Sequence, residues 1–360
     1  MSKKILMLIF VTASLALTMI ARFNISFAEF YALKVYPVFA EVISFLTSKI
    51  NYSLTEFIII FLIIIVLIYF SITLVKTIIN KSLIYFKSFI LNITFALSVA
   101  MFLYVLFCGI NYYRQEFTYY SGLEIKESTT NELINLCESL ISEANELRAN
   151  LKIGKNNITE LFDANYYGTA ERASNSFDKI SRSYDVLKGN YPYPKLVVFS
   201  DVMSHMRITG MFFPFTFEAN INKNVPAYQI PSTMLHELVH LRGFMREDEA
   251  NFISYLACVN SGYDDFAYSG TMLALSYSMN ALYIEDYDSY YNLYNTISED
   301  VKNDMKYSLN YWKQFETIIA DISSKVNDSY LKANNQVDGV KSYGRMVDLL
   351  LAYYANKIQP

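Results

Sequence analysis

The sequence predicts a mainly helical α+β protein in which three apolar membrane helices precede a water-soluble domain. Three uncharged stretches, at residues 5–21, 57–75 and 88–113, each approach the roughly 20 residues that a membrane-spanning helix needs. After the third stretch the composition becomes polar and rich in tyrosine and asparagine, with helical periodicity. We therefore expect a membrane region over 1–113 and a separate domain over 114–360.

The overall composition agrees with this division and excludes several classes of protein. Of 360 residues, 53% are hydrophobic and only 18% are charged, which is too apolar for an ordinary soluble protein. The formal net charge of −4 argues against nucleic acid as a partner and leaves the lipid bilayer as the expected one. Three widely separated cysteines form neither a disulfide framework nor a zinc knuckle: Cys108, Cys137 and Cys258.

Lysines set the expected orientation of the membrane helices. Five of them lie before the first stretch or between the second and third: Lys3, Lys4, Lys76, Lys81 and Lys87. Positive charge collects on the cytoplasmic side of a membrane, so we expect both segments there. With three spans, the protein is then a multi-pass cell-membrane protein with a cytoplasmic N-terminus and an extracytoplasmic C-terminal domain.

Two alternatives concern this membrane region. The stretch Val35–Ser48 is apolar but contains Pro37 and Glu41, so it predicts an interfacial or amphipathic helix in preference to a fourth span. A second interpretation makes the first span a cleaved signal peptide, because Ser26–Ala28 resembles a small-x-small cleavage site. Cleavage would leave a two-span hairpin, and the C-terminal domain would still lie outside.

Local signals predict the elements of the C-terminal domain in order. Thr129 and Glu132 form a capping box at the start of an amphipathic helix. Two prolines introduce residues 196–199, the clearest strand candidate, and a further extended segment is expected over 211–221. Other helices are expected over 169–187, 232–242, 248–260, 270–283, 299–326 and 343–356.

The motif with chemical content is HExxH, which runs from His236 to His240. On a helix these two histidines are one turn apart and face the same side, so two imidazole nitrogens can bind one metal ion. Glu237 is rotated by about 100° and can instead reach a water on that ion as general base. Chance would produce this pattern from three histidines in about one such sequence in a thousand. The motif therefore predicts a zinc-dependent hydrolase, with Zn²⁺ as cofactor and Glu237 as the catalytic residue.

A catalytic zinc site needs a third protein ligand, and the candidates here are acidic. Ser232 and Gly243 are suited to cap the two ends of the motif helix, so the chain can turn back after Gly243. Glu247 and Asn251 then share one face of the next helix, which places a carboxylate on the metal and an amide behind it. Glu249 is the alternative third ligand, but it has no such partner one turn later.

The segment resembles the zincin metallopeptidases. Glu247–Phe252 is similar to the third-ligand helix of the radiation-response and repressor-cleaving members, in which the first Glu of an ExxAN stretch binds the metal. Most of the chain resembles a bacterial membrane family, domain of unknown function 3810. The matching pieces are the three spans, Pro214–Thr216, Glu218–Asn220, HExxH to Asn251, Tyr330–Asn334 and Ser342–Asp348. The chain departs from the family pattern at Phe217, where glycine is usual, and at Leu241, where glutamine is usual.

This resemblance implies hydrolysis of an amide bond in a peptide or protein substrate. Zinc lowers the pKa of a bound water and polarises the carbonyl, while Glu237 takes the proton and later gives it to the leaving amine. By residue type, three groups are candidates to stabilise the oxyanion, although each is more simply explained as structural: His205, Tyr343 and Arg345. The segment 215–222 occupies the position of a substrate-binding edge strand in zincins, or else is a plain core strand.

Other functions stay open at this point. One is a membrane-tethered binding or assembly protein with a structural zinc site, against which the intact Glu237 argues, since such a site has no use for a base. Another is a zinc amidase that acts on cell-wall material. An intramembrane protease is excluded, because the motif lies far beyond the third span and a cluster of charged residues follows it closely.

Overall fold

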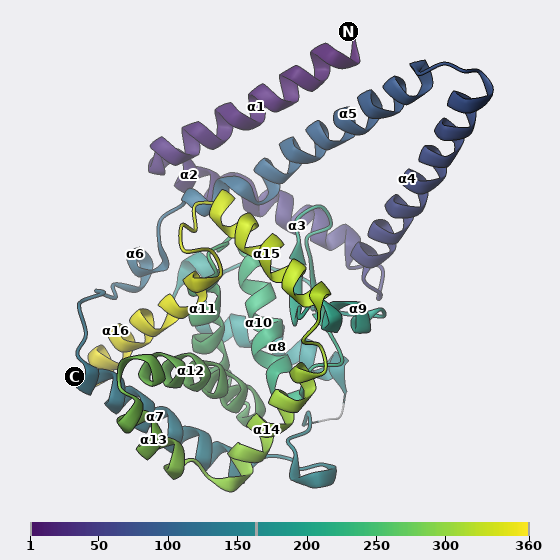
Figure 1. Cartoon of the computed structure of the whole chain (residues 1–360). Coiled ribbons are helices and arrows are strands. Elements are labelled where there is room, and N and C mark those ends of the chain that lie inside the picture. Colours follow the sequence, from purple (N-terminus) through teal and green to yellow (C-terminus); the bar gives the residue numbers. More distant parts are fainter. Residues whose placement is uncertain (1, 163–164, 359–360) are drawn as a thin grey trace. The chain divides into compact units, whose positions relative to one another are not determined.

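The computed structural model describes residues 2–162 and 165–358 and divides the chain into two compact units (Figure 1). The first unit consists of Met1–Gln115 and Phe213–Glu218, and the second of Glu116–Phe212 and Ala219–Pro360. The sequence did not predict that a short segment from the middle of the chain belongs to the first unit.

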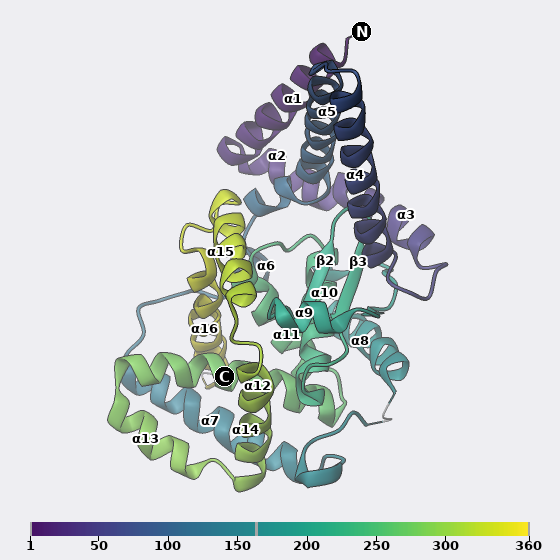
Figure 2. The same ribbon diagram turned by 45° about the vertical axis from the view of Figure 1, so that its right-hand side comes forward.

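Apolar helices form the first unit. α1 and α4 each pack against α5, and the rod made of α2, η1 and α3 crosses their ends instead of running along them (Figure 2). The bounds are α1 (Lys3–Phe23), α2 (Ile25–Phe30), the π-helix η1 (Tyr31–Val35), α3 (Tyr36–Thr47), α4 (Leu54–Ile79), α5 (Ile84–Phe107) and the 3₁₀ helix η2 (Gly109–Tyr113).

Among the described residues, four helical stretches are long and apolar enough to cross a membrane. Three of them, α1, α4 and α5, include or largely overlap the predicted spans. The fourth, Ile25–Thr47, is the least apolar of the four and joins three helical pieces through the π-turn of η1. The sequence predicted only an interfacial helix in part of this stretch, so the structure adds one candidate span to the three expected.

A buried carboxylate holds the segment Phe213–Glu218 in the first unit. Glu218 accepts hydrogen bonds from the backbone N–H groups of Leu54 at 3.2 Å and Thr55 at 2.8 Å, and from the Thr55 hydroxyl at 2.7 Å. The first N–H groups of a helix have no intrahelical acceptor and carry partial positive charge. Glu218 therefore caps the N-terminus of α4.

Phe217, next to this cap, explains one departure from the family pattern. Its φ of 49° lies in the left-handed region, where glycine is ordinary and a bulky side chain is strained. The ring is fully buried and contacts the rings of Tyr36 and Phe107, with centroids 5.7 and 5.2 Å away. Burial of this aromatic side chain offsets the backbone strain that a glycine would avoid.

Helices surround a small sheet in the second unit. Its helices are α6 (Phe117–Ser121), α7 (Thr130–Ala149), α8 (Tyr166–Ile180), α9 (Ser200–His205), α10 (Ile230–Leu241), α11 (Glu247–Val259), α12 (Asp264–Glu285), α13 (Tyr287–Thr296), α14 (Glu299–Lys313), α15 (Ile318–Ala333) and α16 (Met346–Ile358). Short 3₁₀ turns lie at η3 (Lys155–Asn157), η4 (Asp185–Leu187), η5 (Ala227–Gln229) and η6 (Gly339–Arg345). The molecule is thus mainly helical, as the sequence predicted.

Three short strands form one sheet in the order β1, β3, β2. β1 (Lys195–Val197) pairs in parallel with β3 (Glu218–Asn222), with Leu196 opposite Ile221, and β2 (Gly210–Phe213) lies at the edge. The extended segment predicted over 211–221 is therefore a hairpin with a turn in its middle. β3 is central and buried throughout, so the segment predicted over 215–222 contains a core strand and not an edge strand. β2 lies at one edge of the sheet.

The local signals for helices were confirmed in part. The capping box of Thr129 and Glu132 is present at the start of α7. The single helix predicted over 299–326 is wrong, since α14 ends at Lys313 and Thr317 caps a new helix by accepting a hydrogen bond from the Ala320 N–H. The helix predicted over 169–187 already ends at Ile180. All three cysteines are buried and free, as expected.

A buried ion pair ties the helices of the second unit together. Asp304 on α14 accepts hydrogen bonds from Arg148 Nε on α7 at 2.7 Å and from the Tyr268 hydroxyl on α12 at 2.8 Å. The Thr159 N–H donates to the same carboxylate at 2.9 Å. With several donors on one buried carboxylate, the charge of Asp304 is compensated where no water reaches it.

Candidate metal centre

A tight turn between α10 and α11 builds the candidate centre. Arg242 ends α10, and Gly243 follows with a φ of 83°, a conformation that favours glycine. The Gly243 N–H donates to the His240 carbonyl at 2.9 Å and the Phe244 N–H to the Val239 carbonyl at 3.4 Å, which is the paired bond pattern of a Schellman motif. Gly243 thus ends the helix as predicted, although the start lies at Ile230, two residues before Ser232.

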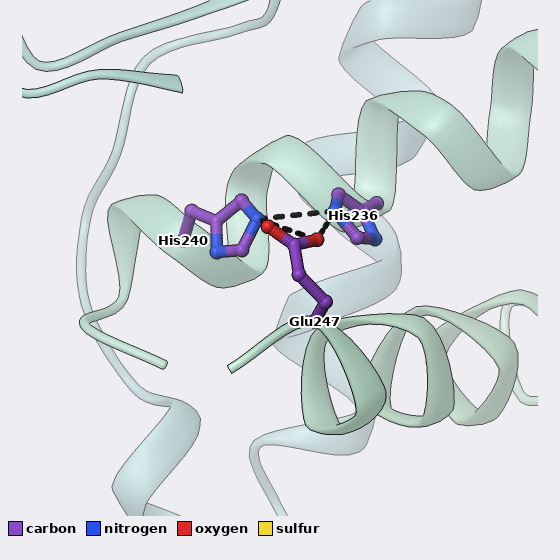
Figure 3. A group of neighbouring side chains, drawn as sticks. All are labelled: His236, His240 and Glu247. Carbon is purple, nitrogen blue, oxygen red and sulfur yellow. Dashed lines mark hydrogen bonds and ion pairs between the residues drawn. The ribbon is translucent and has the colours of Figure 1, made fainter. Parts of the chain in front are cut away.

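The turn brings three side chains to one point (Figure 3). His236 and His240 project from α10, and Glu247 projects toward them from the first turn of α11. The two Nε2 atoms are 3.0 Å apart, and one Glu247 oxygen lies 3.1 Å from His236 Nε2 and 3.6 Å from His240 Nε2. Ligands of a tetrahedral zinc ion at the usual bond lengths lie about 3.3 Å apart. The three atoms therefore fit a zinc ion, with one position left for a water.

The same turn also orients one of the histidines. The Phe244 carbonyl lies 2.8 Å from His240 Nδ1. A carbonyl can only accept, so Nδ1 carries a proton, which leaves Nε2 as the nitrogen that can bind a metal. The sequence predicted that the Asn251 amide would orient a ligand histidine. In the structure a backbone carbonyl, that of Phe244, orients His240.

Glu237 lies beside the centre and is almost fully buried. The Phe212 N–H of β2 donates a hydrogen bond to its carboxylate. At Gly210, at the start of β2, an added Cβ would lie 2.6 Å from Glu237 Oε1 and 2.8 Å from the Thr233 methyl group. Only glycine permits this close approach of β2 to α10. Sequence reasoning missed Gly210, and a glycine at the border of an extended segment was its one signal.

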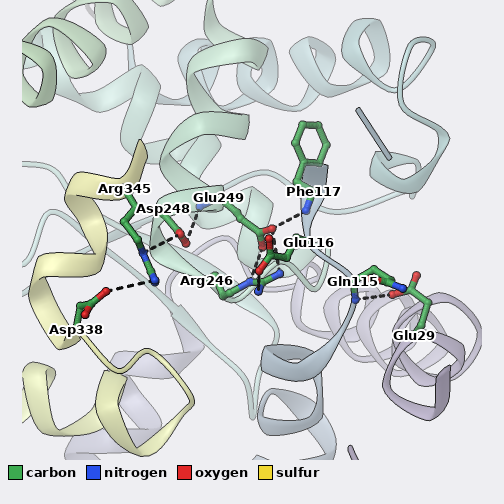
Figure 4. A network of polar contacts seen from close by, with 9 residues as sticks. All are labelled: Glu29, Gln115, Glu116, Phe117, Arg246, Asp248, Glu249, Asp338 and Arg345. Carbon is green, nitrogen blue, oxygen red and sulfur yellow. Dashed lines mark hydrogen bonds and ion pairs between the residues drawn. The ribbon is translucent and has the colours of Figure 1, made fainter. Parts of the chain in front are cut away.

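Glu249, the alternative third ligand, is occupied elsewhere (Figure 4). Its carboxylate pairs with the Arg246 guanidinium at 3.0 Å and accepts a hydrogen bond from the Phe117 N–H at 2.5 Å. Arg246 also contacts Glu116 at 2.8 Å. The structure brings Glu247 to the histidines and uses Glu249 to anchor the start of α6.

The three residues considered for the oxyanion are not brought to the centre by any described contact. Arg345 pairs with Asp248 and Asp338, each at 3.3 Å. The His205 ring packs edge-on against Phe315 with centroids 5.0 Å apart. The side chain of Tyr343 lies outside the described residues.

A tyrosine that sequence reasoning missed lies next to the third-ligand helix. Tyr277 on α12 accepts a long hydrogen bond of 3.4 Å from the Asn251 amide, one turn after Glu247. Burial and the nearby charge of Glu247 raise the pKa of Tyr277 to about 12. Its hydroxyl is therefore protonated at neutral pH. The chain has 31 tyrosines, so nothing in the sequence distinguishes this one.

The charges of the centre favour a cation in its middle. Burial lowers the pKa of His240, but the Glu247 and Glu237 carboxylates raise it further, to about 9. Burial raises the pKa of Glu247, but the two histidines hold it well below its usual range. Burial also raises the pKa of Glu237, although the nearby histidines offset part of this rise. Two buried carboxylates thus draw a proton onto an imidazole when no other cation is present.

The geometry predicts which residues hold the metal. Full-length protein should bind about one zinc ion per chain, and His240→Ala and Glu247→Ala should each lose most of it, because each removes one of three ligands. The matched control is Glu249→Gln, which changes the other glutamate of α11 and should keep the zinc. Elemental mass spectrometry of the purified variants measures this. Zinc that is lost in the control and kept in Glu247→Ala would contradict the assignment.

The electrostatics predict that zinc affinity rises with pH. Because the pKa of His240 is raised from 6.5 to about 9, its proton competes with the metal until the pH rises through about 9. Affinity should fall by about tenfold for each pH unit below that value, for one displaced proton. In the metal-free protein the His240–Glu247 pair stabilises the fold fully below 6.5, and this is lost as the pH rises through about 9. Chelator competition from pH 6 to 9 checks this, and a flat profile would refute it.

Comparison with known proteins agrees with the family resemblance of the sequence. The sequence profile of a family described as "Protein of unknown function (DUF3810)" matches residues 31–351. No curated protein and no solved structure matches the chain. The matched range includes the hairpin of β2 and β3, the HExxH helix and Glu247. The chain therefore belongs to the DUF3810 family.

Proposed function

We propose that this chain is a membrane-anchored, zinc-dependent peptidase whose second unit is a zincin-like catalytic domain. The observation that carries the proposal is the convergence of His236, His240 and Glu247 on one point, with Glu237 beside it. Three ligands and an adjacent buried carboxylate are the donor set of a hydrolytic zinc site. A purely structural site usually has four protein ligands and needs no base.

In this proposal Glu237 performs the proton transfers. A zinc ion held by the three ligands would acidify a bound water and polarise the scissile carbonyl. Glu237 takes the proton of the attacking water on one carboxylate oxygen and later gives it to the nitrogen of the leaving amine. The Phe212 N–H holds this carboxylate in place. Burial of the carboxylate raises the pKa of Glu237, in the direction that suits a general acid and base near neutral pH.

β2 is the element that we propose binds the substrate backbone. It lies at the edge of the sheet, and all four of its residues are partly exposed. An extended peptide can add to such an edge as a further strand, which gives affinity through main-chain hydrogen bonds. Because the β2 backbone already contacts Glu237 at Phe212, a peptide added there would lie close to the general base.

Tyr277 is our candidate for stabilising the developing oxyanion. Its hydroxyl accepts from Asn251 and stays protonated at neutral pH, so the hydroxyl hydrogen is available for donation. It lies close enough to Glu247 for that charge to raise its pKa. A neutral donor of this kind stabilises negative charge that develops on a carbonyl oxygen.

For the membrane region we propose three spans, α1, α4 and α5, and an interfacial rod over Ile25–Thr47. Within the first unit, the rod crosses the ends of the long helices (Figure 2). A helix that lies in the plane of the membrane surface makes this kind of crossing with spanning helices. With three spans and lysine-rich cytoplasmic segments, the second unit lies on the extracytoplasmic side.

Replacing the general base should separate metal binding from catalysis. Glu237→Gln should keep the zinc, since Glu237 is not a ligand, but should lower kcat on casein or a peptide library by about 10²- to 10⁴-fold. Glu249→Gln is the control of equal charge change and should keep its activity. A Glu237→Gln protein with zinc and full biological activity would instead favour a binding or assembly protein.

The topology can be read from fusions to the C-terminus of the full chain. An alkaline phosphatase fused after Pro360 should be active and a green fluorescent protein should be dark, because three spans place this end outside the cytoplasm. Fusions after Asn80, between the second and third spans, should give the opposite pattern. A bright fluorescent fusion after Pro360 would contradict this three-span topology.

A further inference from the structure

An apolar strip lies on the exposed side of α15. Ile318, Ile319, Ile322 and Val326, here called the α15 strip, are exposed to 77%, 56%, 57% and 63%. At 3.6 residues per turn these four side chains fall within an arc of about 100° that contains no charged residue. All four charged residues of the helix gather in the neighbouring arc: Asp321, Lys325, Asp328 and Lys332.

The face that α15 turns inward is the less apolar one. Ala320 and Leu331 are buried, and Ser323 and Asn327 on the same face are half-buried. An ordinary surface helix does the reverse and turns its apolar stripe toward the core. Large aliphatic side chains exposed at helical spacing therefore indicate a surface that contacts a membrane or another protein.

The α15 strip borders a second exposed apolar element of the same unit. The Phe315 ring, just before α15, contacts the His205 ring of α9 at 5.0 Å. The hydroxyls of Tyr311 and Ser204 lie 2.6 Å apart. These contacts hold α9 beside the start of α15 (Figures 1 and 2), and Val202 on α9 is 57% exposed. The apolar surface thus extends beyond one helix.

We propose that the α15 strip inserts into the boundary between headgroups and acyl chains of the bilayer that holds the apolar helices, and so seats the second unit on the membrane. α5 ends at Phe107 and the second unit begins at Glu116, a separation of 116 − 107 = 9 residues. Nine residues span at most about 32 Å when fully extended. The second unit therefore always stays near the lipid surface.

The chemistry of α15 fits lipid as the occupant. An interfacial helix combines an uncharged apolar face with a charged border, and it binds through buried apolar area and attraction to anionic headgroups. The border beside the α15 strip holds Lys325 and Lys332 together with Asp321 and Asp328, and Lys332 pairs with Asp328, so the apolar area of the strip carries the binding. Because the linker keeps the second unit within reach of the bilayer, no soluble partner needs to be recruited to cover the α15 strip. This proposal does not depend on the peptidase activity.

The test uses the full chain in proteoliposomes with a bimane label at Ile322→Cys. The native cysteines are buried and should not react. The control is Ile284→Cys on α12, since Ile284 is 76% exposed and lies outside the α15 strip. Lipids with brominated acyl chains should quench the label at 322 by about twofold or more, and aqueous iodide should quench the label at 284 instead.

A second substitution tests whether the α15 strip itself enters the bilayer. Val326→Asp in the labelled Ile322→Cys chain should abolish lipid quenching, while Ser324→Asp on the other side of α15 should leave it unchanged. Equal quenching at 322 and 284, or quenching at 322 by iodide alone, would overturn the proposal. So would shielding of the label at 322 from both quenchers, together with disulfide cross-linking of two copies of the unlabelled Ile322→Cys chain, which would assign the α15 strip to a protein interface.

Discussion

The chain reversal at Gly243 is the constraint on which the candidate centre depends. It ends α10 directly after His240 and starts α11 with Glu247 facing both histidines. The positive φ of Gly243 and the two backbone hydrogen bonds of the Schellman motif set this angle, and the Phe244 carbonyl in the same turn selects the tautomer of His240. One turn thus positions the three candidate ligands and the carbonyl that orients one of them.

A second constraint is the close approach of β2 to α10. Gly210 leaves room for the Glu237 carboxylate, and Phe212 donates to it. The turn of the same hairpin belongs to the first unit, where Glu218 caps α4 and the buried Phe217 is held against aromatic rings. The edge strand that we propose for substrate binding is therefore continuous in sequence with a segment anchored among the apolar helices of the first unit.

The parts of this structure that were predictable are those encoded locally. The HExxH spacing, the capping box at Thr129 and the glycine at 243 each act through neighbours three or four residues away, so sequence periodicity reveals them. The proximity of Tyr277 to Asn251 and the fit of Gly210 against Glu237 depend on packing between distant segments. The α15 break was missed for a different reason, because Thr317 is a weak signal inside a sequence with continuous helical periodicity.

The two glutamates at the start of α11 show how packing separates chemically identical groups. Glu247 and Glu249 are two residues apart, and α-helical geometry turns them in different directions by about 200°. Arg246 pairs with Glu249 and the Phe117 N–H donates to it, whereas Glu247 lies against the two imidazoles. Together with Glu237, Glu247 leaves an excess of buried negative charge, which raises the pKa of His240 and so favours a proton on its ring. A divalent cation compensates the same charge better and in the geometry already present, which is why metal and proton should compete for this site.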